Sequence, residues 1–219
     1  MTLTVRQFPC LSDNYGFLLP DEARGMVATV DTPDAEAILT EIEASGWGRL
    51  DLILNTHWHP DHTGGNERLK AETGCEIVGP EEVRRAAPLD RVVVDGDLVR
   101  LGETVFEALL SPGHTLGHLV YRSVEDDLAF VGDVIFALGC GRLFEGSPEQ
   151  MWDSLGRIAA WPETTVLVPV GSTRTVELVA ERAGDWALHC HMTHHTMNQM
   201  GHNIPNLIGV NPSEFDEKI

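Results

Sequence analysis

The sequence has few basic residues and no long apolar stretch. Its 219 residues include only 15 lysines and arginines but 34 aspartates and glutamates, which gives a formal net charge of −19. A chain this acidic repels nucleic acids and anionic membranes, so we expect neither as a partner. No apolar run approaches the about 20 residues of a membrane-spanning helix. The N-terminal stretch Met1–Gln7 lacks the apolar core of a signal peptide.

Cysteine is also scarce, and its spacing excludes a common use. The four cysteines lie far apart and form no C-x-x-C pair: Cys10, Cys75, Cys140 and Cys190. This pattern is not that of a disulfide framework, so a reducing compartment is the default and we expect a cytoplasmic protein. The sequence also lacks the G-x-S-x-G motif of one large class of serine hydrolases.

What the sequence does contain is a dense group of metal-ligand side chains. Residues 56–66 read T-H-W-H-P-D-H-T-G-G-N, and the pattern H-x-H-x-D-H supplies His57, His59, Asp61 and His62. The apolar run Leu50–Leu54 leads directly into it, which predicts a strand that ends in a ligand-bearing loop. Imidazoles with one carboxylate suit zinc, iron or manganese and need no thiolate.

Two more predicted strands end in ligands of the same kind. The run Thr104–Leu110 is followed by S-P-G-H, where Pro and Gly make a turn and His114 projects from the strand end. The segment F-V-G-D places Asp133 after another apolar strand. Taken singly, His114 could be an ordinary histidine in a turn, and Asp133 an ordinary surface aspartate. Three such strand ends in one chain indicate a shared metal site.

Strands in runs, punctuated by helices, predict one compact α/β (α+β) domain. One helix is expected to be capped by Thr32, to carry Ala35, Ile38, Leu39 and Ile42 on its apolar face, and to end at Gly46. A second should begin after Ser147 in a capping box with Gln150, with Met151, Trp152, Leu155, Ile158 and Ala159 on its apolar face. The predicted strands are Leu3–Phe8, Gly16–Leu19, Met26–Val30, Leu50–Asn55, Glu76–Val78, Arg91–Val94, Leu98–Leu101, Thr104–Leu110, His118–Arg122, Leu128–Val131 and Thr165–Val170.

On these motifs the chain resembles the metallo-β-lactamase superfamily, from about residue 3 to about residue 170. Within it, the segment G-C-G-R-L-F-E-G at residues 139–146 is similar to the hydroxyacylglutathione hydrolases, or glyoxalase II. The resemblance implies a four-layer αββα metallo-β-lactamase sandwich. It also implies a hydrolase that cleaves glutathione thioesters of the S-lactoylglutathione kind with a metal-activated hydroxide.

The resemblance also implies a role for each matching residue. His57, His59 and His114 would bind one metal, Asp61 and His62 a second, and Asp133 would bridge the two. Two zinc ions are expected, with iron or manganese as alternatives. Asp61 and Asp133 would hold the hydroxide, Arg142, Leu143 and Phe144 would contact the substrate, and His118 and the early turn with Asn14 and Tyr15 would be structural.

The resemblance to glyoxalase II breaks at residue 171. Where that family has a G-H-E-Y-T-type segment, this chain reads G-S-T-R-T, so that Ser172 replaces a histidine ligand of the second metal. We therefore expect a weakened second site. The helical substrate domain of the family also has no match in residues 171–219.

Residues 184–200 instead resemble the C-terminal copper motif of multicopper oxidases, H-C-H-x3-H-x4-M. In that family Cys190, His195 and Met200 would serve the type 1 copper, and His189 and His191 the trinuclear cluster. Such soft ligands are those that copper prefers. The remaining ligands of those oxidases are missing, so oxidase activity is not expected. We expect a hydrolase domain at 1–170 and a cupredoxin-like tail at 171–219, an apparent chimera.

Three functions stay open on the sequence alone. The leading hypothesis is the thioester hydrolase. The second is a mononuclear iron enzyme that resembles the persulfide dioxygenases, which use two histidines and one aspartate. The third is an impaired protein, or one that binds copper through its His/Cys/Met-rich tail.

Overall fold

The computed structural model describes residues 3–161, except 13, 124, 127, 137 and 138. The predicted strand Thr165–Val170, Ser172 and the copper motif lie outside the described residues, and the domain boundary at residue 170 stays a prediction. Most of the described chain belongs to one compact unit, Met1–Ile135 with Gly141–Ala159. In the second unit, Phe136 and Gly139 form an isolated bridge.

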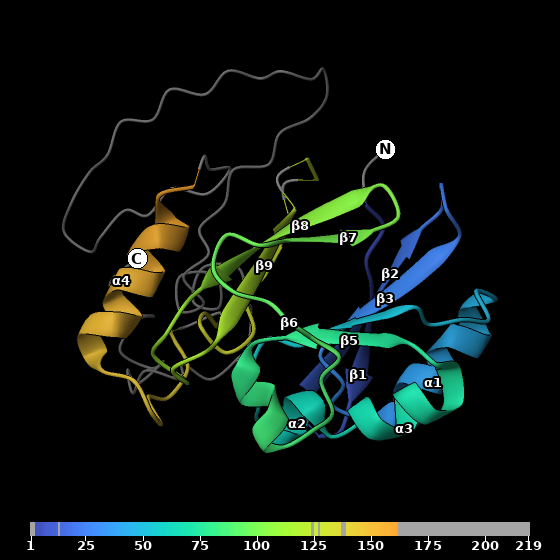
Figure 1. Cartoon of the computed structure of the whole chain (residues 1–219), viewed down its shortest axis with the longest axis horizontal. Helices are drawn as coiled ribbons and strands as arrows, with labels where there is room; N and C mark the ends of the chain where they lie inside the picture. The colour runs from blue at the N-terminus through green and yellow to red at the C-terminus, as the bar shows by residue number, and fades with distance from the viewer. Residues whose placement is uncertain (1–2, 13, 124, 127, 137–138, 162–219) are drawn as a thin grey trace, which may run out of the picture. The chain divides into compact units, whose positions relative to one another are not determined.

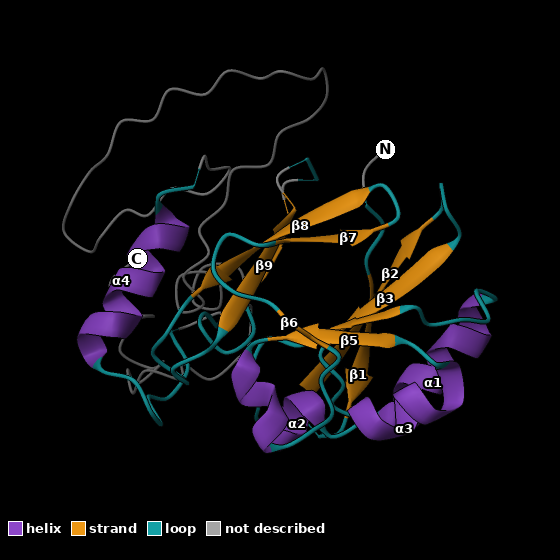
Figure 2. Ribbon diagram, in the orientation of Figure 1, coloured by secondary structure: helices purple, strands orange, loops and turns teal. Residues whose placement is uncertain are grey.

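Two β-sheets form the centre of the first unit (Figures 1 and 2). The larger has the strand order β1-β2-β3-β4-β5-β6, and the smaller has the order β10-β9-β8-β7. The pairs from β3 to β6 are parallel, whereas β1, β2 and the smaller sheet pair antiparallel. The strands are β1 Arg6–Cys10, β2 Asn14–Asp21, β3 Met26–Val30, β4 Leu52–Leu54, β5 Glu76–Gly79, β6 Arg91–Val92, β7 Leu98–Leu101, β8 Thr104–Leu110, β9 Leu119–Ser123 and β10 Leu128–Phe130.

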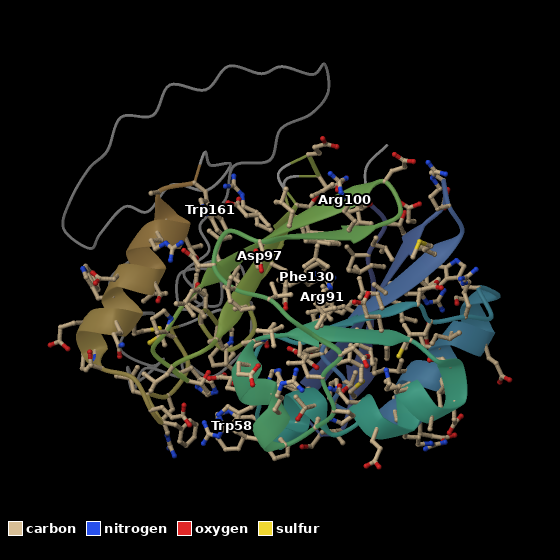
Figure 3. All side chains as sticks on the ribbon, in the orientation of Figure 1. Trp58, Arg91, Asp97, Arg100, Phe130 and Trp161 are labelled. Carbon is tan, nitrogen blue, oxygen red and sulfur yellow. The ribbon has the colours of Figure 1, made fainter. Side chains whose placement is uncertain are left out.

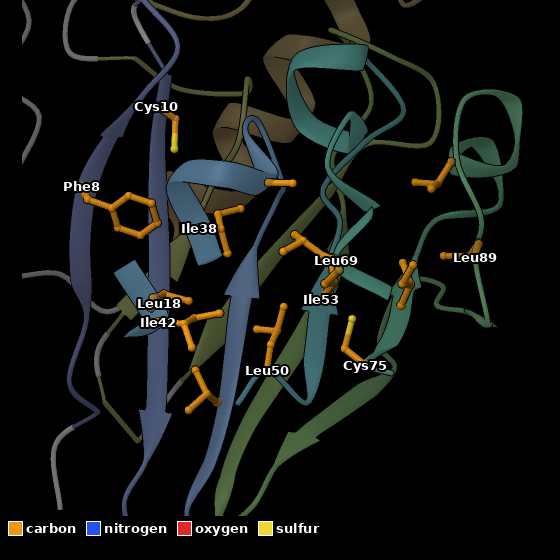
Figure 4. Packing of buried hydrophobic residues seen from close by; sticks show 14 residues of the cluster. Phe8, Cys10, Leu18, Ile38, Ile42, Leu50, Ile53, Leu69, Cys75 and Leu89 are labelled. Carbon is orange, nitrogen blue, oxygen red and sulfur yellow. The ribbon is translucent and has the colours of Figure 1, made fainter. Parts of the chain in front are cut away.

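Both faces of the larger sheet are buried along its central strands β3 to β5. Successive side chains on a strand point to opposite faces, so these strands contribute to two cores. Ile53 and Leu18 pack under the helices in one core cluster (Figure 4). Their neighbours Leu54 and Leu19 belong to a second cluster between the two sheets. There the rings of Phe17 and Phe130 meet at 5.6 Å, and Figure 3 shows Phe130 between the sheets. Two apolar faces per strand explain the continuous apolar runs of the sequence.

Helices cover the outer face of the larger sheet, and they confirm most of the predicted helix signals. They are α1 Ala35–Ser45, α2 Pro60–Thr63, α3 Asn66–Thr73 and the 3-10 turn η1 Glu81–Arg85. Gly46 ends α1 in the left-handed conformation as predicted. The predicted cap Thr32 is wrong. Asp34 caps α1 through the N–H groups of Glu36 and Ala37, whereas the Thr32 hydroxyl is buried and donates to Asn66 at 2.6 Å.

The helix α4, Pro148–Ala159, begins with the predicted capping box. The Ser147 N–H donates to Oε1 of Gln150 at 2.8 Å, and the Gln150 N–H donates back to the Ser147 hydroxyl at 3.3 Å. The predictions for Trp152 and Ala159 are wrong, because the Trp152 side chain is 75% exposed and Ala159 is exposed as well. The buried contacts of α4 run instead through Met151 and Ser154, whose hydroxyl donates to the Pro112 carbonyl.

The described residues thus show one helical layer on the larger sheet, two packed sheets and the helix α4. Within them, Cys10, Cys75 and Cys140 are free thiols, and no helix is long and apolar enough to cross a membrane. The parallel strands β3 and β4 end side by side, as the pair Val30–Leu54 shows. In open α/β sheets the carboxyl ends of such strands are where ligands bind.

Candidate metal centre

Three histidines from two strand-end loops converge on one point. His57 and His59 follow β4, and His114 follows β8. His59 Nδ1 lies 2.9 Å from His57 Nε2 and 2.9 Å from His114 Nε2. The rings meet edge to face, with His57 and His114 buried and His59 partly exposed. The three predicted ligands of the first metal are therefore brought together.

The hydrogen bonds around the cluster determine which nitrogen atoms carry protons. The Thr56 hydroxyl donates to Asp31, so at 3.0 Å it accepts a hydrogen bond from Nδ1 of His57. His114 Nδ1 donates to the carbonyl of Arg142 at 2.7 Å. In the neutral imidazoles, the Nε2 atoms of His57 and His114 are then unprotonated and carry their lone pairs into the cluster.

The electrostatics of the cluster fit a bound cation. Burial, together with the neighbouring histidines, holds the pKa of His57 far below its usual value. Burial and His114 also lower the pKa of His59. Neutral imidazoles whose lone pairs point at one another repel, and a shared metal ion converts this repulsion into coordination.

A second group shares His57 with the first. It consists of His57, His62 and Asp133, whose ligand atoms lie within 4.8 Å of one another. Asp133 spans both groups, because Oδ1 lies 3.2 Å from Nε2 of His62 and Oδ2 lies 3.2 Å from Nε2 of His114. Asp61 lies at the edge of this group, 3.5 Å from Nε2 of His62. Asp133 itself lies between the two groups, and this position suits the bridging role predicted for it.

Asp31 is a member of the site that the sequence analysis missed. It follows β3 and adopts φ of 55°, a left-handed conformation that is uncommon for an aspartate. Its carboxylate accepts from the Thr56 N–H at 2.7 Å and from His62 Nδ1 at 2.8 Å. Burial opposes a charge on His62, but Asp31 and Asp133 prevail and raise the pKa of His62 to about 10. Asp31 thus turns Nε2 of His62 toward the other ligands.

Two more residues hold the carboxylates of the site. The side-chain amide of Asn14 donates to Oδ2 of Asp61 at 3.2 Å, so Asn14 has a contact to the site beyond the structural role predicted for it. His118 is fully buried, stacks on His57 with ring centroids 4.8 Å apart, and accepts the Asp133 N–H at 3.1 Å. Burial, together with His114, lowers the pKa of His118 to about 3. His118 therefore supports Asp133 as a neutral acceptor.

The predicted substrate residues lie beside the cluster. Phe144 is 58% exposed, and its ring meets His59 and His114 edge to face at 5.2 and 5.3 Å. The Arg142 guanidinium is exposed and lies 5.7 Å from the Phe144 ring, and Leu143 is half-buried. These residues place an aromatic wall and a cation next to the imidazoles.

A search for carboxylates directly after every predicted apolar strand would have found Asp31, since it directly follows the apolar run of β3. No signal in the sequence marks Asn14 as a partner of Asp61. The proposed copper ligands His189, Cys190, His191, His195 and Met200 lie outside the described residues, as does Ser172.

Comparison with known proteins gives two family matches. The model of the metallo-beta-lactamase superfamily matches residues 30–170, and that of multicopper oxidase matches residues 141–208. A hydroxyacylglutathione hydrolase of Erythrobacter litoralis is 51% identical over 165 residues, or 75% of this chain and 65% of the relative. Another of Maricaulis maris is 52% identical over 164 residues, or 74% and 64%. The chain therefore spans a little under two thirds of the length of these relatives. The crystal structure of ETHE1 from Myxococcus xanthus matches with a TM-score of 0.65 at 32% identity, over 73% of this chain and 71% of that one.

Proposed function

The chain belongs to the metallo-beta-lactamase superfamily, and from that premise we propose that it is a metal-dependent hydrolase of the glyoxalase II type. Its substrate would be a thioester of glutathione, and the products glutathione and a 2-hydroxy acid. The observation that carries the proposal is the convergence of His57, His59 and His114 with Asp133 between them and His62. The names of the relatives at 51% and 52% identity point to the same substrate class.

We propose that His57, His59 and His114 hold one metal ion, that Asp61 and His62 hold a second, and that Asp133 is shared. Two zinc ions are the expected pair, with iron or manganese as alternatives. Such ions lower the pKa of a bound water toward neutrality and polarise the carbonyl under attack. Asp31 and Asp133 raise the pKa of His62 and so favour its protonated form, and a metal ion at this site would compete with that proton, so metal binding should weaken as the pH falls.

The other residues of the site would orient the substrate and the ligands. Asn14 steadies the Asp61 carboxylate, and Asp31 fixes the ring of His62. Phe144 offers an aromatic surface beside the reacting centre. Since the chain carries a net charge of −19, attraction of an anionic glutathione group must be local, and the exposed Arg142 beside Phe144 would supply it.

The second metal is the weak point of the proposal. Ser172 stands where the resemblance implies a histidine. One of His189, His191, His194 or His195 could take the vacant ligand position, and replacing that histidine by alanine would then remove one metal per chain. The match to multicopper oxidase at residues 141–208 favours a separate hypothesis, that the tail binds copper through its own His, Cys and Met residues.

Elemental analysis of protein purified without added metal, followed by hydrolysis of S-lactoylglutathione, tests these proposals together. We expect about two zinc ions per chain and thioesterase turnover. One iron per chain with sulfite formation from glutathione persulfide would replace the proposal by the dioxygenase alternative. Stoichiometric copper without turnover would favour the copper-binding tail.

The variant Asp133→Asn tests the shared carboxylate. We expect a loss of kcat of at least about 100-fold, as for other preorganised electrostatic groups at a reacting centre. Glu81→Gln is the matched control, because Glu81 is an exposed acid that pairs only with Arg84 among the described contacts. Equal activity of the two variants would contradict the role of Asp133.

A further inference from the structure

One cation outside the metal centre contacts its loops. Arg85 is the last residue of η1, lies in none of the motifs of the sequence, and has a side chain that is 50% exposed. Its partners, Trp58 and Glu145, belong to two loops of the site. Neither partner is among the proposed metal ligands.

The first contact reaches the histidine loop. The Arg85 guanidinium lies 3.9 Å from the centre of the Trp58 ring, a cation–π contact, and Figure 3 shows Trp58 beside η1. Trp58 stands between His57 and His59 in the sequence, and its ring lies 4.8 Å from that of His59. Arg85 therefore packs behind the ring that flanks a proposed ligand.

The second contact reaches two further loops. Nη1 of Arg85 donates to Oε1 of Glu145 at 2.6 Å, and Oε2 of Glu145 accepts the N–H of Leu116 at 3.3 Å. Glu145 directly follows Phe144, and Leu116 lies two residues after His114. The Glu145 side chain is only 19% exposed. Burial opposes its charge, but the bonds from Arg85 and Leu116 keep the pKa of Glu145 below its usual value.

A neighbouring carboxylate holds the same loop without Arg85. Glu82, also in η1, accepts from the Thr115 hydroxyl and the Gly117 N–H, both at 2.6 Å. The loop of His114 should therefore keep its backbone path when Arg85 is lost. The segment that carries Glu145 and Phe144 also has backbone bonds to the His114 loop, from the Phe144 N–H to the His114 carbonyl at 3.2 Å and from the Gly146 N–H to the Gly113 carbonyl at 3.1 Å. Arg85 adds the charged contact through the Glu145 side chain.

We propose that Arg85 is a positioning residue that holds Phe144 against His59 and His114 by joining Trp58, Glu145 and Leu116. Its effect on substrate binding rests on the proposed function, whereas the joining of the loops does not. Among the described contacts Arg85 meets Trp58 and Glu145 and none of the proposed ligands, so its loss should affect the position of Phe144 and leave the metal site loaded.

The test replaces Arg85 by methionine, which keeps the apolar stem but removes the charge and the hydrogen bonds. We expect KM for S-lactoylglutathione to rise about threefold to tenfold, the range that an ordinary aromatic contact supports. We expect kcat to change by less than about twofold and the metal content to stay constant. Hydrogen exchange of the full metal-loaded chain should rise in residues 141–147 and at Leu116, but not in the core strand Met26–Val30.

Arg84→Met is the matched control. Arg84 is the neighbouring residue in η1, is 49% exposed, and pairs with Glu81 away from the site loops. The variant Arg84→Met should leave KM unchanged, and also the hydrogen exchange of residues 141–147 and of Leu116. A second variant, Glu145→Gln, should raise KM as much as Arg85→Met does. The double variant should show no larger rise in KM than either single variant, because the two residues act as one unit.

Unchanged exchange in residues 141–147 of Arg85→Met would overturn the proposal. So would an additive rise of KM in the double variant, or a fall in thermal stability with no change in KM. If the wild-type chain shows no thioesterase activity, the proposed function fails, but the exchange measurement still decides whether Arg85 joins the loops.

Discussion

Asp31 and His62 form a buried pair in which Nδ1 of His62 donates to Oδ2 of Asp31 at 2.8 Å. The same carboxylate also accepts the N–H and the hydroxyl of Thr56, and that hydroxyl in turn faces His57. One carboxylate therefore orients two proposed ligands. Carboxylates behind metal-bound histidines commonly have this role.

The variant Asp31→Asn tests this pair. The amide of Asn must present an N–H on one side, either to the Thr56 N–H or to Nδ1 of His62. The second arrangement moves the imidazole proton to Nε2, where it blocks a metal ion. We expect metal affinity at the group of His57, His62 and Asp133 to fall about 10- to 100-fold, the usual effect of losing such a partner.

The measurement is metal content after dialysis against a graded chelator. The control is Asp51→Asn, since Asp51 accepts a backbone N–H, that of Val27, next to the other end of β4. If both variants lose metal equally, the effect is one of stability and not of ligand orientation.

Gly132 precedes the shared carboxylate and tolerates no side chain. Its φ is +48°, and a Cβ there would lie 2.7 Å from Nε2 of His118 and 2.8 Å from the hydroxyl of Thr56. Gly132→Ala should cost about 2 to 4 kcal/mol of unfolding free energy, from backbone strain plus this overlap. It should also release metal, because His118 holds the N–H of Asp133.

Gly48→Ala separates the two causes. Gly48 has a φ of +65°, but a Cβ there meets nothing within 4 Å. It should therefore show only the strain, about 1 to 2 kcal/mol, with full metal content. Urea unfolding and elemental analysis of both variants are sufficient, and metal retention in Gly132→Ala would contradict the argument.

The capping box of α4 should contribute to stability without affecting the site. Ser147→Ala leaves the Gln150 N–H without its side-chain acceptor and should cost about 1 kcal/mol. In Ser45→Ala at the end of α1, where the hydroxyl donates to a carbonyl, the free energy of unfolding should change by less than about 0.5 kcal/mol. Urea unfolding distinguishes them, and equal values would argue against the cap.

Asp21 gives a prediction about pH. Burial raises its pKa, but the N–H groups of Arg24, Glu103 and Thr104 outweigh this and lower the pKa below its usual 3.8. A carboxyl group whose pKa is lowered by folding stabilises the protein above its unfolded-state pKa, and this contribution disappears as the pH falls through the folded-state pKa. Asp21→Asn should thus be less stable than the wild type by the same amount at pH 7 and pH 5.

The difference between Asp21→Asn and the wild type should shrink below pH 4. Urea unfolding at each pH measures it. A difference that grows as the pH falls would have the wrong sign and would contradict the account.

The sequence was sufficient to predict the elements whose cause is local. The strand Met26–Val30, the Gly46 terminus of α1 and the Ser147–Gln150 box depend on residues a few positions apart, and the structure confirms all three. The convergence of His57, His59 and His114 was also predicted, from their motifs and the family resemblance. His57 and His59 follow β4 in the larger sheet and His114 follows β8 in the smaller one, so it is the packing of the two sheets that brings them together.

Local rules failed where two neighbouring residues competed for one role. Thr32 and Asp34 are both good caps, and Asp34 takes the position because the Thr32 hydroxyl is engaged by Asn66. Trp152 matches the helical apolar spacing, but among the described residues the buried positions of α4 are Met151 and Ser154, and Trp152 is exposed.

The sequence by itself determined which side chains could bind a metal and which strands they follow, because ligand type and strand periodicity are properties of short segments. Only the tertiary structure decided which partners orient them, Asp31 for His62 and Asn14 for Asp61, and which residue packs on the Trp58 ring between His57 and His59, namely Arg85. These pairs join residues 27 or more positions apart. Their contacts depend on the order of strands in the sheets and on the paths of loops, which burial of the whole core determines and no local pattern encodes.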